Sequence, residues 1–367
     1  MKNLSLFFSK WNKRLRIFFR LLLHKLNIDK RPVFAVLTVT SQCNYSCSYC
    51  FSDYHKKANI ALSTENILKI IDELHQYGVI YLNVHGGEAL LRQDIGIIIE
   101  HALSKKMFVN LITNGVLLKK KWEQVKKVNS ICISLDGREE NNDKNRKKGS
   151  FKSAVEAIDF VLAQAIPVRI GMTITRHTQH DLHYIAEFAK TRKIFIQPFL
   201  LFDQENLPQD IRMTSRENKV ALESLIKLKK EGYPIFYSLE TLEYAYNWPF
   251  EQEHLKKSDL NNTILQSNFP FRECYYKKLN ILVENDGSIR ACNARARKGL
   301  HISLSNNFIK DAKEALLKQD DCLYCYHLPK NEFGNLMSLR LPTLMGQFSH
   351  QLKEDIRSIY GRPKRKL

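Results

Sequence analysis

The stretch VFAVLTVTSQCNYSCSYCF, residues 33–51, decides how the fold of this chain is interpreted. Its first eight residues, Val33–Thr40, are apolar or β-branched and predict a buried strand. Three cysteines follow within eight residues, at Cys43, Cys47 and Cys50. In a chain of this length, such close spacing indicates a metal or cluster site rather than disulfides, and therefore a reducing compartment.

Downstream of this loop, strand-like and helix-like patterns alternate. We expect strands at Val79–His85, Met107–Thr113, Ser130–Ser134, Val168–Thr175 and Ile194–Leu200. Amphipathic helices are expected at Ser63–Tyr77, Ile95–Lys105, Ser150–Gln164 and Asp181–Lys190, with Ser63 and Ser150 as N-caps. Six βα units with right-handed crossovers predict an α/β fold with a parallel sheet, curled into a partial (βα)6 TIM-like barrel. A small C-terminal α+β domain is expected to follow it.

The conspicuous polar motifs all follow predicted strands. They are the cysteine loop, Gly86-Gly87-Glu88, Thr113-Asn114-Gly115 and Asp136-Gly137. In a barrel, chemistry gathers on the loops that follow strand C-termini. The sequence therefore predicts one active-site face.

Three thiolates in one loop can bind three irons of a cubane cluster and leave the fourth iron open. The alternatives are a zinc site, which normally needs a fourth protein ligand nearby, or cysteines that belong to the core. The C-x3-C-x2-C spacing after a first strand resembles the signature of the radical S-adenosylmethionine (SAM) superfamily. The resemblance covers most of residues 33–335. It implies that Cys43, Cys47 and Cys50 hold a [4Fe–4S] cluster that cleaves SAM.

The same resemblance supplies candidates for the SAM pocket. Gly86-Gly87-Glu88 looks like the family motif whose backbone and carboxylate hold the SAM amino group, although Ala89 replaces the usual proline. The glycines would permit close backbone approach. The family pattern also implies that Phe51 lies beside adenine, and that Thr113 and Asn114 border the cavity.

A further pair of candidates follows the fourth strand. Ser134-Leu135-Asp136-Gly137 is similar to the family segment that reaches the SAM ribose and carboxylate. Ser134 and Arg146 reproduce the spacing of a serine and an arginine that share the SAM carboxylate in anaerobic sulfatase-maturating enzymes. An arginine fork suits a carboxylate. Arg146 lies in a lysine-rich loop, so a solvated surface charge is the alternative.

Four more cysteines form a second set, at Cys274, Cys292, Cys322 and Cys325. Four thiolates can hold a fully ligated [4Fe–4S] cluster or a zinc ion. The C-x12-G-x4-C spacing around Gly287 resembles SPASM and twitch domains, and a layout of four cysteines is similar to the twitch domain of 2-deoxy-scyllo-inosamine dehydrogenase. The resemblance implies one auxiliary cluster. Cys132, inside a predicted strand, is expected to be a buried structural thiol.

The formal charge of +19 is concentrated at the ends of the chain. Residues 1–30 contribute +7 and residues 351–367 contribute +4, which is not the spread of basic residues typical of a nucleic-acid enzyme. An apolar stripe runs along the first helix through Leu4, Phe8, Trp11, Leu15, Phe18, Phe19, Leu22 and Leu26. No apolar run is long enough to span a membrane. Attachment to a membrane surface and packing on the enzyme's own body both remain open.

The expected organisation is a basic amphipathic helix (1–30), a radical SAM core (31–235), a helical connector (236–270), a twitch domain (271–335) and a basic C-terminal helix and tail (336–367). The expected activity is formation of a 5′-deoxyadenosyl radical that abstracts hydrogen from a substrate, with the auxiliary cluster assisting oxidation or bond formation. A membrane-associated substrate is one hypothesis, and maturation of a peptide or protein is the alternative. A small soluble substrate also remains open.

Further expectations concern partners and location. The resemblance implies an external electron donor of the flavodoxin or ferredoxin type. The expected location is cytoplasmic, and peripheral attachment to the inner face of the membrane is one of the two alternatives left open for the first helix. No general base can be assigned: His85, beside the Gly-Gly-Glu turn, fits a core role as well as a catalytic one. A non-catalytic electron carrier is disfavoured, because Glu88, Ser134 and Arg146 would then have no ligand to hold.

Overall fold

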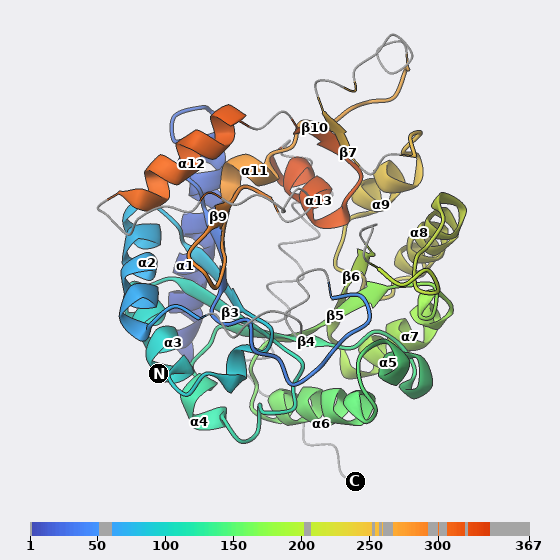
Figure 1. Cartoon of the computed structure of the whole chain (residues 1–367), viewed down its shortest axis with the longest axis horizontal. Coiled ribbons are helices and arrows are strands. Elements are labelled where there is room, and N and C mark those ends of the chain that lie inside the picture. Colours follow the sequence, from blue (N-terminus) through green and yellow to red (C-terminus); the bar gives the residue numbers. More distant parts are fainter. Residues whose placement is uncertain are drawn as a thin grey trace.

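The computed structural model describes residues 2–50, 61–201, 207–251, 254–256, 259, 267–292, 300, 307–319 and 322–337. Its core is an eight-stranded sheet in the order β6-β5-β4-β3-β2-β1-β8-β9. Six parallel strands follow one another along the chain: β1 (Phe34–Thr38), β2 (Tyr81–His85), β3 (Phe108–Thr113), β4 (Ser130–Ser134), β5 (Val168–Ile174) and β6 (Phe195–Leu200). Figure 1 shows the sheet curled into an incomplete ring with helices around its outside. The predicted partial barrel is confirmed.

The outer layer consists of helices that follow the strands. They are α2 (Thr64–Gln76), α3 (Ile95–Ser104), α4 (Trp122–Val125), α5 (Glu139–Asn145), α6 (Ser150–Ala163), α7 (Leu182–Arg192) and α8 (Ser215–Lys230), with short 3₁₀ turns at Ala89–Leu91 and Gln179–Asp181. Ser63 caps α2 as predicted, since its side chain accepts from the Asn66 amide at 3.2 Å. The N-cap predicted at Ser150 is wrong. Gly149, at φ +82°, takes that position, and the Ser150 hydroxyl bonds Asp143 instead.

The C-terminal region extends the core sheet. β8 (Asn280–Val283) pairs parallel with β1, and β9 (Ile289–Arg290) returns antiparallel to β8. The turn between them places Gly287 at φ +84°, which is why glycine is suited there. Residues of the predicted twitch domain therefore share a hydrogen-bonded sheet with the SAM core.

Most of the remaining elements lie across the gap between the two ends of that sheet, whereas α12 lies beside α2 and β9 (Figure 1). They are α9 (Leu239–Tyr246), α11 (Tyr276–Leu279), α12 (Phe308–Gln319), α13 (Leu328–Met337) and a two-stranded sheet of β7 (His254–Lys256) with β10 (Cys322–Cys325). Glu332 of α13 is buried and accepts from the hydroxyls of Ser238 and Thr241 at 2.9 and 2.6 Å. This bonding fixes α13 against α9.

Helix α1 (Lys2–Lys25) packs on the body through part of its surface. Ile17 and Leu21 contact a small core that includes Val33, Ile80 and Met337. These two residues do not belong to the predicted stripe. Of the predicted stripe, Leu15, Phe18, Phe19 and Leu26 are 38–58% exposed, and Leu22 is half-buried. Leu15 and Phe18 also line the cavity that contains Cys43. Both readings of this helix thus have a physical basis.

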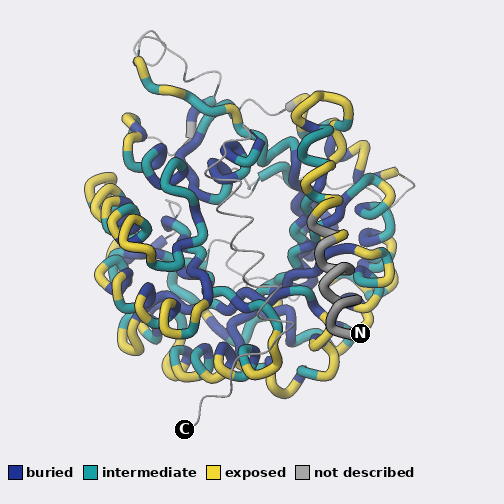
Figure 2. Tube along the Cα trace, turned by 180° about the vertical axis from the view of Figure 1, so that it is seen from behind, coloured by how far each residue is buried: buried dark blue, intermediate teal, exposed yellow. Residues whose placement is uncertain are grey.

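Burial follows the ring, as Figure 2 shows. The strands and the inward faces of the helices are buried, whereas the outer helix faces are exposed. The main core lies between sheet and helices and includes Leu37, Ile70, Leu82, Val109 and Ile158. Among the described helices, none has an apolar stretch sufficient to cross a bilayer.

Candidate active site

The cysteine loop is held in place by the loop after β3 and by the segment that follows β4. The Asn114 side-chain amide donates to the Asn44 side-chain oxygen at 2.7 Å, and Ser48 donates to the Asn145 carbonyl from both its backbone amide and its hydroxyl. The Tyr49 hydroxyl donates to Asp136 at 2.6 Å. Residues 43–50 are therefore fixed by contacts far away in sequence.

The Gly-Gly-Glu turn packs against the backbone that leads into the cysteine loop. The Gly87 and Glu88 amides donate to the carbonyls of Thr40 and Gln42 at 2.9 and 2.7 Å. A Cβ added at Gly86 or Gly87 would lie 2.6 or 2.3 Å from one of those oxygens. The absence of a Cβ at these glycines thus lets the turn pack on the backbone that leads into the cysteine loop. Their close approach to SAM remains a prediction.

Glu88 ties this turn to the end of β3. Its carboxylate accepts from the Thr113 hydroxyl at 2.9 Å, the Asn114 amide at 2.8 Å and the Leu90 amide at 3.1 Å. The side chain is buried, and burial raises the pKa of Glu88. Thr113 and Asn114 therefore act first as partners of Glu88. The contact of Glu88 with a SAM amino group remains a prediction.

The loop after β4 carries a buried ion pair. Arg146 donates to Asp136 through two nitrogens at 2.7 and 2.8 Å, and the Arg146 side chain is only 8% exposed. Asp136 is fully buried and also accepts from the Thr173 amide at 2.9 Å. The Arg146 guanidinium lies 5.4 Å from the Tyr49 ring. Arg146 is thus not a solvated surface charge, and it orients both Asp136 and the cysteine loop.

One cavity of about 930 Å³ brings the predicted site residues together. Its lining includes Cys43, Cys47, Cys50, Gly86, Gly87, Glu88, Thr113, Asn114, Ser134 and Arg146. Asp136 is buried beside it, and Phe51 lies outside the described residues. The cavity continues through the barrel to α1 and α13, where Ile17, Leu21 and Phe333 line it.

The three thiols of this loop are half-buried. Burial raises the pKa of Cys43 and raises that of Cys47 to about 12, so ligation would release their protons. Within the described residues, no three His, Cys, Asp or Glu side chains meet closely enough to hold a single metal ion. A cubane binds each thiolate to a different iron, so its ligands need not meet at one point. The donor set and its position in the cavity wall fit a [4Fe–4S] cluster.

The second cysteine set gathers around α11, β10 and α13. Cys325 donates to Cys274, which lowers the pKa of Cys274 to about 6 and raises that of Cys325. Cys292 contributes to the raised pKa values of both Cys325 and Tyr276. Cys322 lies on β10 with Cys325. The structure therefore brings together Cys274, Cys292 and Cys325, which lie up to 51 positions apart. Cys132 is buried in β4, as predicted, and it lines the large cavity beside Ser134. Its role as a structural thiol remains a prediction.

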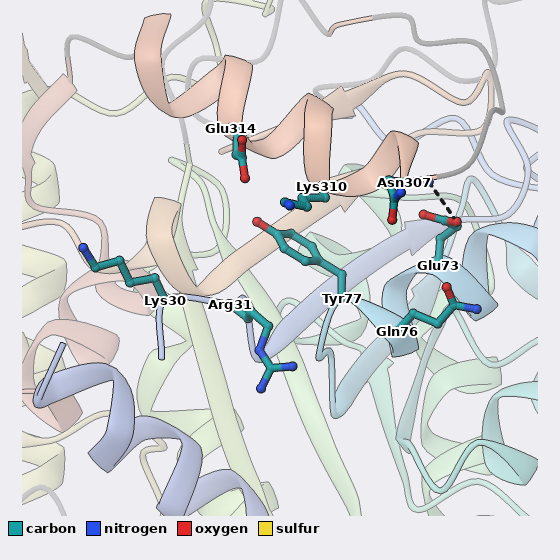
Figure 3. Close-up of a pocket in the computed structure, with 8 residues that line it drawn as sticks. All are labelled: Lys30, Arg31, Glu73, Gln76, Tyr77, Asn307, Lys310 and Glu314. Atoms are coloured by element: carbon teal, nitrogen blue, oxygen red, sulfur yellow. Dashed lines mark hydrogen bonds between the residues drawn. The ribbon is translucent and has the colours of Figure 1, made fainter. Parts of the chain in front are cut away.

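A second, smaller cavity of about 450 Å³ lies at the other edge of the sheet (Figure 3). It is lined by Lys30, Arg31, Glu73, Gln76, Tyr77, Asn307, Lys310 and Glu314. The Asn307 amide donates to Glu73 at 3.2 Å and joins the start of α12 to α2. Because Arg31 precedes β1, this cavity lies where the strands begin and is separate from the cysteine loop.

Sequence reasoning missed several residues that shape the site. Tyr49 donates to Asp136 and Asn145 accepts from Ser48, so both residues anchor the cysteine loop. Lys330 lines the large cavity from α13. Tyr49 stands between two predicted ligands, which was a signal that could have found it. Nothing in the local pattern around Lys330 indicates its position.

Comparison with known proteins gives a family for the core. Residues 37–189 match the model of the radical SAM superfamily. The Fe-coproporphyrin III synthase of Methanosarcina barkeri is 29% identical over 56% of this chain and 54% of its own length. The mycofactocin maturase MftC of Mycobacterium ulcerans is 34% identical over 43% of this chain and 44% of its own length. The matched stretch thus spans about half of each of these relatives.

Solved structures share the fold over most of the chain. SuiB of Streptococcus suis superposes with a TM-score of 0.60 and 17% identity, over 86% of this chain and 70% of SuiB. The protein anSMEcpe with bound AdoMet also gives a TM-score of 0.60, with 15% identity over 90% of this chain and 100% of its own. At these identities the likeness concerns the fold alone.

Proposed function

Residues 37–189 form a radical SAM domain, so the chain belongs to the radical SAM superfamily, and from this premise we propose that it abstracts hydrogen from a substrate. Members of the superfamily use a [4Fe–4S] cluster and SAM, which together supply a 5′-deoxyadenosyl radical. We assign the cluster to Cys43, Cys47 and Cys50, and SAM to Phe51, Gly86, Gly87, Glu88, Thr113, Asn114, Ser134, Asp136 and Arg146. The observation that carries this proposal is the shared cavity, which holds the three thiols beside Glu88, Ser134 and Arg146.

Within this proposal each part of the wall has a separate task. The hydrogen bonds of Asn114, Asn145 and Asp136 fix the loop that carries the thiols. The carbonyls of the Gly-Gly-Glu turn and the buried Glu88 carboxylate offer acceptors for an ammonium group. Arg146 offers a buried positive charge for a carboxylate, already oriented by Asp136. A cavity of about 930 Å³ is at the upper end of the range for small-molecule sites, which leaves room for a substrate beside SAM.

Four further thiols favour an auxiliary cluster of the twitch type at Cys274, Cys292, Cys322 and Cys325. A cluster there can take one electron from a substrate radical. Loss of one hydrogen atom, one electron and one proton then amounts to a two-electron oxidation of the substrate. The external donor returns no net electron to the substrate, since its electron is used to cleave SAM.

The test is anaerobic reconstitution followed by iron counting and detection of 5′-deoxyadenosine. With dithionite and SAM, the wild-type protein should release 5′-deoxyadenosine and bind about eight irons. Cys47→Ala should release no 5′-deoxyadenosine and should retain about four irons. Cys325→Ala should also retain about four irons. Cys132→Ala is the matched control and should keep the full iron content. Absence of 5′-deoxyadenosine from the fully loaded wild type would overturn the proposal.

We further propose that α1 attaches the enzyme to an anionic membrane surface. Phe18, Phe19 and Leu26 are 44%, 57% and 58% exposed, and the helix and the residues after it carry Arg16, Lys25 and Lys30. Apolar and basic side chains together favour an interfacial site. Phe19→Glu should reduce flotation with phosphatidylglycerol vesicles, whereas Ile97→Glu, at a site 56% exposed on α3, should not. Equal flotation of the two variants would contradict this attachment.

A peptide substrate is the second candidate. It is favoured by similarity to proteins named mycofactocin maturase, sporulation killing factor maturation protein and PqqA peptide cyclase. Peptide and membrane-extract fractions should be compared for their ability to increase 5′-deoxyadenosine release. The fraction that contains the substrate should increase the release of 5′-deoxyadenosine. An active peptide would favour a peptide maturase over an enzyme that acts on a membrane-associated substrate.

A further inference from the structure

Helix α1 lies at the end of the barrel where the strands begin. Its residues Ile17 and Leu21 pack in the small core of Val33 and Ile80, which directly precede β1 and β2. Figure 2 shows this helix on the near face of the ring. The cysteine loop follows β1 and so lies at the opposite end of the barrel. The large cavity, which is lined by residues from both places, therefore runs through the barrel from one end to the other.

The cavity meets the protein surface beside α1. Leu15 and Phe18 line the cavity, yet their side chains are 38% and 44% exposed. A side chain that faces a cavity and also reaches solvent lies at the mouth of that cavity. The adjacent Phe19 is 57% exposed and is not part of the cavity wall. The mouth therefore opens on the same helix that we propose to contact the membrane.

The cavity wall nearest to α1 is aromatic. The register of the parallel strands places Phe34, Tyr81 and Phe108 side by side in one layer. The ring centres of Phe34 and Tyr81 are 5.7 Å apart, and those of Tyr81 and Phe108 are 4.8 Å apart. Phe333 of α13 extends this layer, with its ring 4.8 Å from that of Phe34. Such a wall stabilises methylene or isoprene groups by removing them from water, and it offers no compensation for an ion.

Polar side chains begin one layer further into the barrel. The register places Asn83, Asn110 and Ser130 together there. Asn110 donates to Asn83 at 2.8 Å and accepts from the Ser130 hydroxyl at 2.6 Å. Beyond this layer the wall includes Arg169 and, beside the cysteine loop, Glu88. The cavity is therefore polar at the end that carries the thiols and apolar at the end beside α1.

We propose that the substrate carries a long apolar chain, acyl or isoprenoid, which occupies the aromatic end of the cavity and leaves the barrel beside α1. Its polar head then lies at the thiol end of the cavity. Strand β1 rises about 3.3 Å per residue, so the stretch from Phe34 to Thr38 spans about 13 Å, which is the least that such a chain must cover. A chain that passes from a bilayer into this mouth exchanges one apolar environment for another, so its transfer does not require exposure to water. The inference rests on the proposed function, and it adds the chemical class of the substrate.

The test measures binding of an apolar chain without SAM cleavage. The reconstituted full-length protein is titrated with cis-parinaric acid, whose fluorescence increases in an apolar site. The bound probe is then displaced with 1-octanol, 1-dodecanol, farnesol or N-acetyl-trileucine amide. We expect saturable binding and displacement that becomes about fourfold tighter per added methylene between the two straight-chain alcohols. Whether 1-dodecanol or farnesol displaces at the lower concentration distinguishes an acyl from an isoprenoid chain.

Two neighbouring positions on α1 supply the decisive variant and its control. Phe18→Glu places a charge at the mouth and should weaken probe binding by about tenfold or more, and because Phe18 is exposed the melting temperature should stay unchanged. Phe19→Glu adds the same charge outside the cavity wall and should bind the probe as the wild type does. Val36→Trp narrows the cavity one layer above Phe34 and should remove the advantage of 1-dodecanol over 1-octanol.

Equal probe binding by Phe18→Glu and Phe19→Glu would overturn the inference. Displacement by N-acetyl-trileucine amide but by neither 1-dodecanol nor farnesol would overturn it in favour of a peptide. Release of 5′-deoxyadenosine by a wild type that binds no probe would overturn this inference alone. Probe binding by a wild type that releases no 5′-deoxyadenosine would instead count against the proposed function.

Discussion

Substitution of Asp136 tests the buried ion pair that holds the site together. In Asp136→Asn the guanidinium of Arg146 keeps its charge and loses its ionic partner, although both side chains remain at 8% exposure or less. Breaking a buried pair from one side costs about 3–5 kcal/mol. Total stabilities of about 5–15 kcal/mol make this a large fraction. At about 2 °C per kcal/mol, the melting temperature should fall by roughly 6–10 °C.

The matched control is a surface pair with the same geometry. Arg192 contacts Asp159 through two nitrogens at 2.8 and 3.1 Å, but the Asp159 side chain is 51% exposed. Because water screens such a pair, Asp159→Asn should cost about 0–1 kcal/mol. The assay is anaerobic thermal unfolding of the reconstituted proteins. Equal melting temperatures for the two variants would refute the reasoning.

A double variant separates the orphaned charge from other causes. In Asp136→Asn/Arg146→Met, the buried positive charge is removed together with its partner. Neutral replacement of a buried pair is often tolerated, so the double variant should recover part of the loss seen in Asp136→Asn. If it melts no higher than Asp136→Asn, then the unpaired charge of Arg146 is not the source of the destabilisation.

Three further predictions concern other parts of the molecule. Gly87→Ala should halve the iron content to about four, because its Cβ would lie 2.3 Å from a carbonyl oxygen of the segment that leads into the cysteine loop. Gly96→Ala should keep the full iron content, because the nearest contact of its Cβ is a side-chain carbon at 3.1 Å. The Arg31 hydrogen bond lowers the pKa of Asp29 to about 2. Asp29 should therefore contribute about 1 kcal/mol or less of stability above pH 4, and this contribution should be lost as the pH falls toward 2. The melting temperatures of wild type and Asp29→Asn should converge over that range, and a constant difference would contradict this. Cys132→Ala should lower stability by about 1 kcal/mol with no change in the absorbance of the reconstituted clusters, and a change in that absorbance would show a role beyond the core.

Much of the site was predictable because its parts lie at the ends of consecutive strands. In a parallel sheet built from βα units, the C-terminal ends meet at one edge. The positions of Cys43, Glu88, Thr113 and Ser134 after or at the end of successive strands therefore sufficed to predict one cavity wall. The rotation of individual side chains was not predictable. Arg146 turns toward Asp136 because a buried guanidinium needs a carboxylate, and α5 carries the chain from one residue to the other.

The orientation of α1 shows a different limit. Its sequence offers apolar side chains on more than one face, so periodicity alone cannot select the face that packs. Contact of Ile17 and Leu21 with the core around Val33 and Met337 makes that choice and leaves Phe18 and Phe19 exposed. Competition between two similar apolar faces is decided by the surface they meet.

The sequence by itself determined the order of the βα units and the two cysteine sets, because strand periodicity and ligand spacing are local properties of the chain. Only the tertiary structure decided that β8 joins β1 and that Lys330 of α13 lines the large cavity. Both depend on contacts between segments far apart in sequence, whose approach is set by the packing of α11, α13 and β10. The three cysteines after the first strand indicated the chemistry, and packing set the charges around it.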